Sequence, residues 1–189
     1  MTGKLIYNLN VSLDGFVETP DHGLDWASVD EEVHTWFNEQ AGSLDAEIYG
    51  RKLYEVMAAY WPTAEDDPDA TPAMREFARL WNATPRVVFS TTLTSVGPNA
   101  RVVRGDVGAV LDDLRREHEG DIGVAGANIA GQYVTRGLVD EFRLIVHPVV
   151  LGAGTPFWPV LDRPLNLRLV DRREFSSGVE LRSYVPADR

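Results

Sequence analysis

The spacing of hydrophobic residues predicts strands and helices that alternate along most of the chain. Short apolar runs that end at Gly or Ser are typical of buried strands, whereas apolar residues three and four positions apart are typical of amphipathic helices. We predict strands over residues 4–11, 46–49, 86–89, 101–104 and 122–125. We predict helices over residues 30–41, 73–81, 107–117 and about 127–136, and one more that begins at residue 51.

The pattern changes after residue 140. A strand is predicted over residues 141–150, interrupted by His147-Pro148, and two further strands, 165–175 and 179–185, are joined by a hairpin turn. We interpret this part as consecutive antiparallel strands. The whole chain, residues 1–189, is therefore predicted to form a single α/β domain with three layers, α/β/α. Its sheet is expected to be mostly parallel, with about eight strands and an antiparallel C-terminal hairpin.

Composition narrows the classes of function. The 189 residues are 44% hydrophobic, enough for one sizeable core, and the net charge of −11 argues against nucleic acid, which requires a basic surface. The absence of cysteine excludes disulfides, a thiol nucleophile and cysteine-ligated metals. The four histidines do not cluster, so no metal site is expected. No leader-like start and no apolar run of roughly 20 residues is visible, so we expect a cytoplasmic protein that does not contact membranes.

The stretch from Asp121 to Gly131 combines a short apolar strand with the start of a helix. Gly126 breaks the strand, and Ile129, Tyr133 and Val134 follow at helical spacing. A helix start presents unpaired N–H groups and the positive end of the helix dipole, and glycine allows a ligand to approach the backbone. The stretch is therefore either a site for an anion, typically phosphate, or only a tight connection.

Polar residues follow the other predicted strands as well. They are Ser12-Leu13-Asp14-Gly15, Gly50-Arg51-Lys52 and Ser90-Thr91-Thr92. In an open parallel sheet, ligands bind beyond the carboxyl ends of the strands. The basic pair could grip a phosphate or simply begin an exposed helix, and the hydroxyl residues could bind a ligand or simply cap a strand. Together they predict a cradle for a phosphorylated cofactor.

The order of these elements and their motifs resembles the dihydrofolate reductase superfamily. Within it, the chain is most similar to the pyrimidine reductase of riboflavin biosynthesis, the C-terminal domain family of the bifunctional deaminase-reductase. The resemblance spans nearly the whole length and rests on SLDGF, YGRKLYE, VVFSTTL, VAGANIAGQ and DEFRLIVHPVVLGAGTPFW. It implies NADPH as the cofactor and hydride transfer to a small pyrimidine- or pterin-like heterocycle, as in a 5-amino-6-(5-phosphoribosylamino)uracil reductase. It also implies a homodimer, which we place near residues 149–158.

The resemblance also assigns cofactor-binding positions. The pyrophosphate would be met by Gly126, Ala127, Asn128 and Ile129 and by Arg51, Lys52 and Leu53. The adenine ribose and its 2′-phosphate would lie near Ser90 and Thr91. The nicotinamide would be bordered by Val11, Ser12, Asp14 and Gly15, with the loop to Trp26 as a flap. The chain departs from the family at Ala125, where many members have glycine, and at Leu53, where dihydrofolate reductases have a hydroxyl residue.

Reduction of a C=N or C=O bond also needs a proton donor. The catalytic candidates are Asp14 and Asp30, with turn formation and a solvated helix start as their alternatives. Trp26 and Phe37 are candidates to contact a flat substrate, although aromatic residues at helical spacing also form core. Two other functions remain open at this stage. The chain could be a non-catalytic nucleotide-binding protein that kept the fold, or an unrelated flavin- or nucleotide-binding α/β protein.

Overall fold

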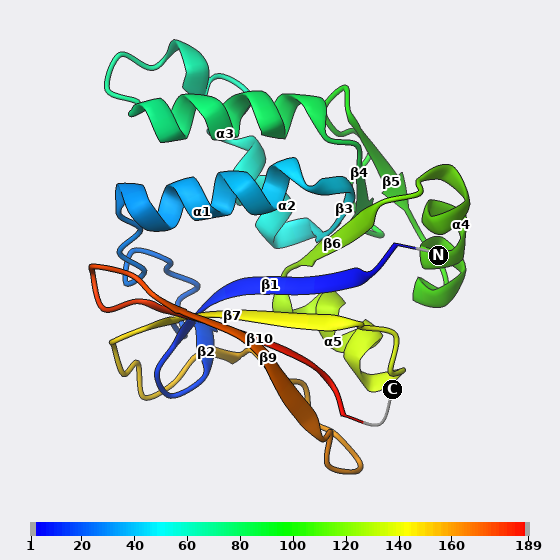
Figure 1. The fold of residues 1–189 in the computed structure, drawn as a ribbon. Coiled ribbons are helices and arrows are strands. Elements are labelled where there is room, and N and C mark those ends of the chain that lie inside the picture. Colours follow the sequence, from blue (N-terminus) through cyan, green and yellow to red (C-terminus); the bar gives the residue numbers. More distant parts are fainter. Residues whose placement is uncertain (1–2, 188–189) are drawn as a thin grey trace.

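The computed structural model describes residues 3–187 and has one eight-stranded sheet (Figure 1). The strand order is β5-β4-β3-β6-β1-β7-β10-β9. The sheet strands are β1 (Leu5–Ser12), β3 (Leu44–Gly50), β4 (Arg86–Phe89), β5 (Ala100–Val103), β6 (Asp121–Ala125), β7 (Glu141–His147), β9 (Leu167–Glu174) and β10 (Glu180–Pro186). The helices are α1 (Glu31–Gly42), α2 (Arg51–Ala58), α3 (Pro72–Ala83), α4 (Val107–Glu117) and α5 (Ala127–Thr135), with a short 3-10 helix, η1 (Ala64–Asp66).

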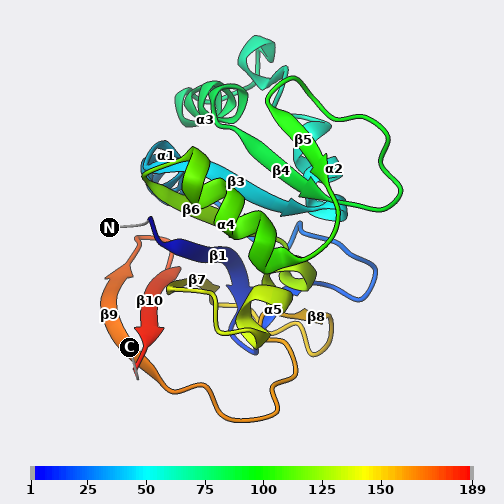
Figure 2. The same cartoon turned by 90° about the vertical axis from the view of Figure 1, so that its right-hand side faces the viewer.

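Helices cover both faces of the sheet, which confirms the predicted α/β/α layers (Figures 1 and 2). On one face α4 and α5 pack on the larger core, in which Tyr7, Ile48 and Tyr133 are fully buried. On the other face α1 and α3 lie side by side, and α1 packs its Val33 and Trp36 on Ile145 of β7. Each sheet face therefore carries its own apolar residues, which explains the nearly continuous apolar runs of the central strands.

The predicted antiparallel part begins later than the sequence pattern indicated. Strand β7 pairs in parallel with β1, with Asn8 opposite Arg143, and only β10 and β9 run antiparallel to their neighbours. The helix α5 lies between β6 and β7 in the chain, and such a crossover returns the chain in the same direction. Strand β7 also ends at His147, earlier than predicted, because Pro148 has no N–H for the ladder.

A second, small ribbon was absent from the prediction. Strand β2 (Phe16–Glu18) pairs with β8 (Thr155–Pro156), so the segment after Gly15 is held against the segment after β7. The approach is close, because a Cβ on Gly154 would lie 1.9 Å from the Glu18 carbonyl oxygen. The Tyr7 ring stacks on Phe157 at 4.1 Å and its hydroxyl donates to the Phe157 carbonyl, which fixes this segment on the main core.

No helix within residues 3–187 has the length and apolar character needed to span a membrane. No group of three or more His, Asp or Glu side chains in that range is arranged to hold a metal ion.

Candidate active site

A cleft of about 850 Å³ opens between α1, α2 and the sheet, on the face that α1 and α3 cover. Its outer end lies where the parallel strands finish, and its inner end lies beneath the last turn of α1. The walls are mainly apolar, and they include Leu24, Phe37, Leu53, Met57 and Phe77. A cleft of this size with apolar walls and a few polar groups suits a flat ligand of the size of a cofactor and its partner.

Two helix starts without side-chain caps meet at the outer end of the cleft. Gly50 precedes α2 and Gly126 precedes α5, and neither helix has a capping hydrogen bond from a side chain. By contrast α1, α3 and α4 are capped by Asp30, Thr71 and Asp106. A Cβ on Gly126 would lie 3.7 Å from the Gly50 nitrogen, so the two helix starts are adjacent, with room for little more than one atom between these positions. Their free N–H groups and dipoles form a site for an anionic group.

All seven residues predicted for the pyrophosphate line this cleft. They are Arg51, Lys52, Leu53, Gly126, Ala127, Asn128 and Ile129. Gly126 has φ of +102°, a conformation that glycine adopts without the strain a side chain would bring. The Arg51 guanidinium is held by Glu55 at 2.7 Å, and the Lys52 ammonium lies 3.1 Å from Nε2 of His22 in the predicted flap. Both cations therefore line the cleft. The partner of Arg51 is an exposed carboxylate, and the partner of Lys52 is a ring nitrogen of His22.

The residues predicted for the nicotinamide sit at the turn after β1. Ser12 is buried, donates to Asp14 at 2.7 Å and accepts from the Phe16 nitrogen, while Val11 packs in the core. Gly15, at φ +93°, closes the turn. Within residues 3–187, Val11, Ser12 and Gly15 do not reach the cleft lining, although Asn10 and Val17 on either side of them do.

The two predicted ribose residues also lie outside the cleft lining. Ser90 follows β4, and its hydroxyl accepts from the Thr92 and Leu93 nitrogens at 3.2 and 2.9 Å. Thr91 is exposed. Phe89, the residue before them, does line the cleft. Ser90 and Thr91 therefore follow a residue of the cleft lining in the chain but do not line the cleft themselves.

Both predicted catalytic carboxylates are engaged in backbone contacts. Asp14 accepts from the Leu151 and Gly152 nitrogens at 3.1 and 2.7 Å, and its bond from Ser12, followed by these two, lowers its pKa. Asp30 caps α1 by accepting from the Val33 nitrogen at 2.8 Å. Neither side chain is part of the cleft lining described within residues 3–187. Their positions fit structural roles, in turn formation and helix capping.

The two aromatic residues predicted for the substrate both line the cleft. Trp26 lies in the loop between β2 and α1, and its indole Nε1 is buried without a hydrogen-bond partner in residues 3–187. Its ring meets His147 edge-on at 5.5 Å. Phe37 projects from α1 and packs edge-on against Trp36. A buried indole N–H with no partner is a donor that a ligand could use.

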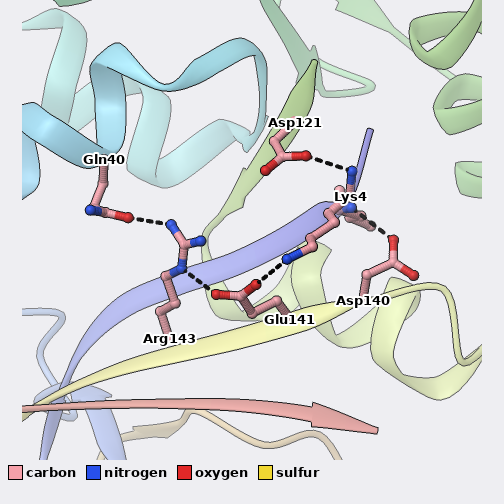
Figure 3. Close-up of polar contacts among 7 residues, drawn as sticks. Lys4, Gln40, Asp121, Asp140, Glu141 and Arg143 are labelled. Atoms are coloured by element: carbon pink, nitrogen blue, oxygen red, sulfur yellow. Dashed lines mark hydrogen bonds and ion pairs between the residues drawn. The ribbon is translucent and has the colours of Figure 1, made fainter. Parts of the chain in front are cut away.

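A chain of polar and charged groups adjoins the inner end of the cleft, where Gln40 and Arg143 are part of the lining (Figure 3). The Arg143 guanidinium donates to Glu141 at 2.7 Å and to the Gln40 carbonyl of α1, and Glu141 also accepts from the Lys4 ammonium at 3.0 Å. Burial alone would raise the pKa of Glu141, but the hydrogen bonds and charges of Arg143 and Lys4 outweigh it and lower the pKa. Arg143, which lines the cleft, is thereby fixed between β7 and α1.

Sequence reasoning missed this inner end. Asn8, Gln40, Glu47, Tyr49 and Arg143 all line the cleft. The Asn8 amide oxygen is buried and has no partner within residues 3–187. A signal was present, because polar residues in otherwise apolar central strands are costly unless paired or functional. The choice between those two explanations needed the positions of the neighbouring strands.

The sheet order, the layers and the cleft beside two uncapped helix starts define a dihydrofolate reductase-like α/β protein. Over nearly its full length the fold matches the dihydrofolate reductase of Enterococcus faecalis solved with NADP(H), with a TM-score of 0.67, 13% identity, and coverage of 100% of this chain and 99% of that one. The chain belongs to the RibD C-terminal domain family, whose model matches residues 3–181.

Two further proteins are similar to this chain over most of its length. The uncharacterized protein YyaP of Bacillus subtilis (strain 168) is 34% identical over 177 residues, which are 93% of this chain and 91% of that protein. The structure of a putative riboflavin biosynthesis protein from Shewanella sp. PV-4 matches with a TM-score of 0.76 and 20% identity, and covers 97% of this chain and 98% of that one.

Proposed function

We propose that the protein is an NADPH-dependent reductase that transfers a hydride to a small heterocyclic substrate. One observation carries the proposal: the uncapped starts of α2 and α5 lie next to each other at the cleft, beside Arg51 and Lys52. Two helix dipoles, a bidentate guanidinium and an ammonium suit a phosphorylated cofactor. Bound NADPH would supply the hydride. Membership of a reductase-fold family and likeness to a dihydrofolate reductase solved with NADP(H) support the assignment.

The rest of the cleft suits a flat, neutral ring as the acceptor. Phe37 and Trp26 offer aromatic surfaces, and the inner polar groups offer both donors and acceptors to ring nitrogen and oxygen atoms. Asn8 and Arg143, on the neighbouring strands β1 and β7, would therefore orient the ring. A pyrimidine-like substrate related to 5-amino-6-(5-phosphoribosylamino)uracil fits this arrangement and the family.

The expected homodimer is part of the proposal. Val150 and Val160, in the segment after β7, are 66% and 94% exposed. Exposed apolar residues on one segment favour an interface there. Sedimentation of the wild type beside Val150→Asp and Val160→Asp tests it, because a dimer through this segment becomes monomeric in the variants, whereas a wild-type monomer contradicts it.

Cofactor binding is the decisive test of the function. We expect NADPH fluorescence to change on titration with pure protein, with micromolar affinity, and we expect NADPH oxidation with at least one compound of a panel of pyrimidines and pterins. No binding at millimolar cofactor contradicts the proposal. Binding without turnover across the panel supports instead a nucleotide-binding protein that kept the fold.

A further inference from the structure

The proposed reaction needs a proton as well as a hydride, and the cleft limits where it can come from. Three carboxyl groups line the cleft within residues 3–187: Glu18, Glu47 and Glu55. Glu18 accepts from Thr155 and from His22 in the flap loop. Glu55 is an exposed partner of Arg51. Both therefore act in ion pairs or hydrogen bonds at the outer end, and Glu47 is the carboxyl on the floor of the cleft.

Glu47 lies on the floor of the cleft between two neighbouring strands. It is on β3, three residues before the end of the strand, and pairs in register with Gly123 of β6. The Leu44 side chain covers Gly123, because a Cβ there would lie 2.7 Å from Leu44 Cδ1 and 3.7 Å from the Glu47 Cγ. The Glu47 side chain is 15% exposed, whereas its partner Arg86 is 4% exposed. Glu47 is thus a partly exposed residue of the cleft lining.

The contacts of Glu47 are few and long for a buried carboxyl group. The Tyr49 hydroxyl donates to one oxygen and the Arg86 Nε to the other, each at 3.2 Å. The Arg86 guanidinium does not grip the carboxyl with both nitrogens, because it stacks 3.7 Å from the Trp81 ring and its Nη2 is buried without a partner in residues 3–187. A single long contact stabilises a carboxylate less than a bidentate one. Burial therefore prevails over Arg86 and Tyr49, and it raises the pKa of Glu47.

Apart from burial, Arg86 and Tyr49 are the groups that shift the pKa of Glu47. Strand β6 presents Gly123 to the cleft, and α1 presents Gln40, whose carbonyl binds the Arg143 guanidinium. The cations of α2, Arg51 and Lys52, lie at the outer end beyond Gly50. The protonation of Glu47 thus depends on Arg86, on Tyr49 and on how much water the cleft admits.

We propose that Glu47 is the general acid of this reductase and gives its proton to the substrate heteroatom. The inference rests on the proposed function. As the substrate carbon of a C=N or C=O bond accepts the hydride of NADPH, the π electrons pass to the heteroatom, which forms a bond to the proton of the Glu47 O–H. The O–H bond breaks, Glu47 is left as a carboxylate and the cofactor as NADP⁺. The carboxylate takes a proton from water when the product leaves.

The first experiment compares the wild type with Glu47→Gln and with Glu55→Gln as the matched control. In a pH titration followed by infrared difference spectra, a carboxyl band that titrates above the ordinary glutamate range is expected in the wild type and is lost only in Glu47→Gln. With 5-amino-6-(5-phosphoribosylamino)uracil or 7,8-dihydrofolate as the probe, NADPH oxidation is expected to fall at least about a hundredfold in Glu47→Gln, while its NADPH Kd stays within about twofold. Unchanged oxidation, or an unchanged carboxyl band, overturns the proposal.

A second variant, Tyr49→Phe, removes only a phenol oxygen and keeps the ring. Its hydroxyl hydrogen bond stabilises the carboxylate, so its loss raises the pKa of Glu47 further. The high-pH limb of the pH–rate profile, where the acid loses its proton, is expected to move to higher pH. The midpoint of the infrared titration of the carboxyl band is expected to move in the same direction. If neither the high-pH limb of the pH–rate profile nor the infrared titration of the carboxyl band moves in Tyr49→Phe, the role proposed for Glu47 is wrong. If no probe is reduced, the proposed function fails, and the carboxyl band still reports separately on Glu47.

Discussion

The Nε2 atom of His22 lies 3.1 Å from the ammonium of Lys52, which joins the loop between β2 and α1 to the start of α2. On its other side, the His22 Nδ1 lies 2.8 Å from the Glu18 carboxylate. An ammonium can only donate, so Nε2 accepts from Lys52 and Nδ1 donates to Glu18. His22 therefore bridges a cation and an anion, and it ties the loop to a helix that lines the cleft.

Replacing His22 is expected to loosen the loop without unfolding the protein. In His22→Ala the bridge between Glu18 and Lys52 is lost, so the amides of residues 19–26 are expected to exchange hydrogen several-fold faster, because the loop opens more often. Hydrogen-exchange mass spectrometry measures this, with His118→Ala at the end of α4 as the control. Equal exchange in His22→Ala and the wild type would show that the loop is held by other contacts.

Arg51 is expected to contribute more to NADPH than to NADH binding. A guanidinium grips a phosphate dianion through charge-assisted hydrogen bonds, and NADH lacks the 2′-phosphate. We expect Arg51→Ala to weaken NADPH about tenfold, or about 1.4 kcal/mol, and NADH much less. The control is Arg79→Ala, which removes an exposed ion pair with Glu65 of the same 2.7 Å length. An equal loss for both cofactors would show that Arg51 acts only on the pyrophosphate, which NADPH and NADH share, and not also on the 2′-phosphate.

Gly126 is expected to contribute both to folding stability and to cofactor binding. Gly105, which has a similar backbone conformation, serves as a control that separates these two contributions. Gly126 and Gly105 have φ of +102° and +107°, so alanine at either position is strained and should cost about 1–2 kcal/mol of unfolding free energy. A Cβ on Gly105 meets no atom within 4 Å, whereas one on Gly126 enters the gap between the two helix starts. Urea unfolding should therefore show a similar loss for both variants. Only Gly126→Ala should lose NADPH affinity, by about tenfold or more, and equal affinities in the two variants would contradict the anion site.

Glu141 is expected to stabilise the fold above its unfolded pKa. Its folded pKa is lowered, so its contribution is fully present above about pH 4.3, the ordinary value in an unfolded chain, and is lost as the pH falls through the folded pKa. At pH 7, Glu141→Gln should lower the unfolding free energy by about 2–4 kcal/mol, because Arg143 is left buried without its anion.

The difference between wild type and Glu141→Gln should then shrink as the pH is lowered below about 4. Urea unfolding across pH 3–7 measures it. The exposed pair of Arg101 and Glu117 has the same 2.7 Å separation, and Glu117→Gln should change stability little at any pH. A constant difference for Glu141→Gln across this range would contradict the lowered pKa.

The outer end of the site could be predicted because its residues are set by local rules. Gly50, Arg51 and Gly126 lie at strand-to-helix turns, where the backbone conformation and the free N–H groups follow from the sequence itself. Parallel strands then bring such turns to one edge. The inner end could not be predicted in this way. Asn8, Glu47 and Arg143 come from three strands far apart in the chain, and their shared cleft depends on the strand order.

By itself, the sequence determined the class of fold, the alternation of strands and helices, and the strand-to-helix turns at the outer end of the cleft, where we propose that an anionic group binds. These depend on periodicity and on residues close together in the chain. Tertiary structure decided that β7 runs parallel to β1, that Asp14 and Asp30 bind backbone N–H groups, and that Glu47 opens onto the floor of the cleft beside Gly123. The physical reason is that burial, ion pairing and access to a ligand are properties of neighbours in space, and strand order alone makes them neighbours.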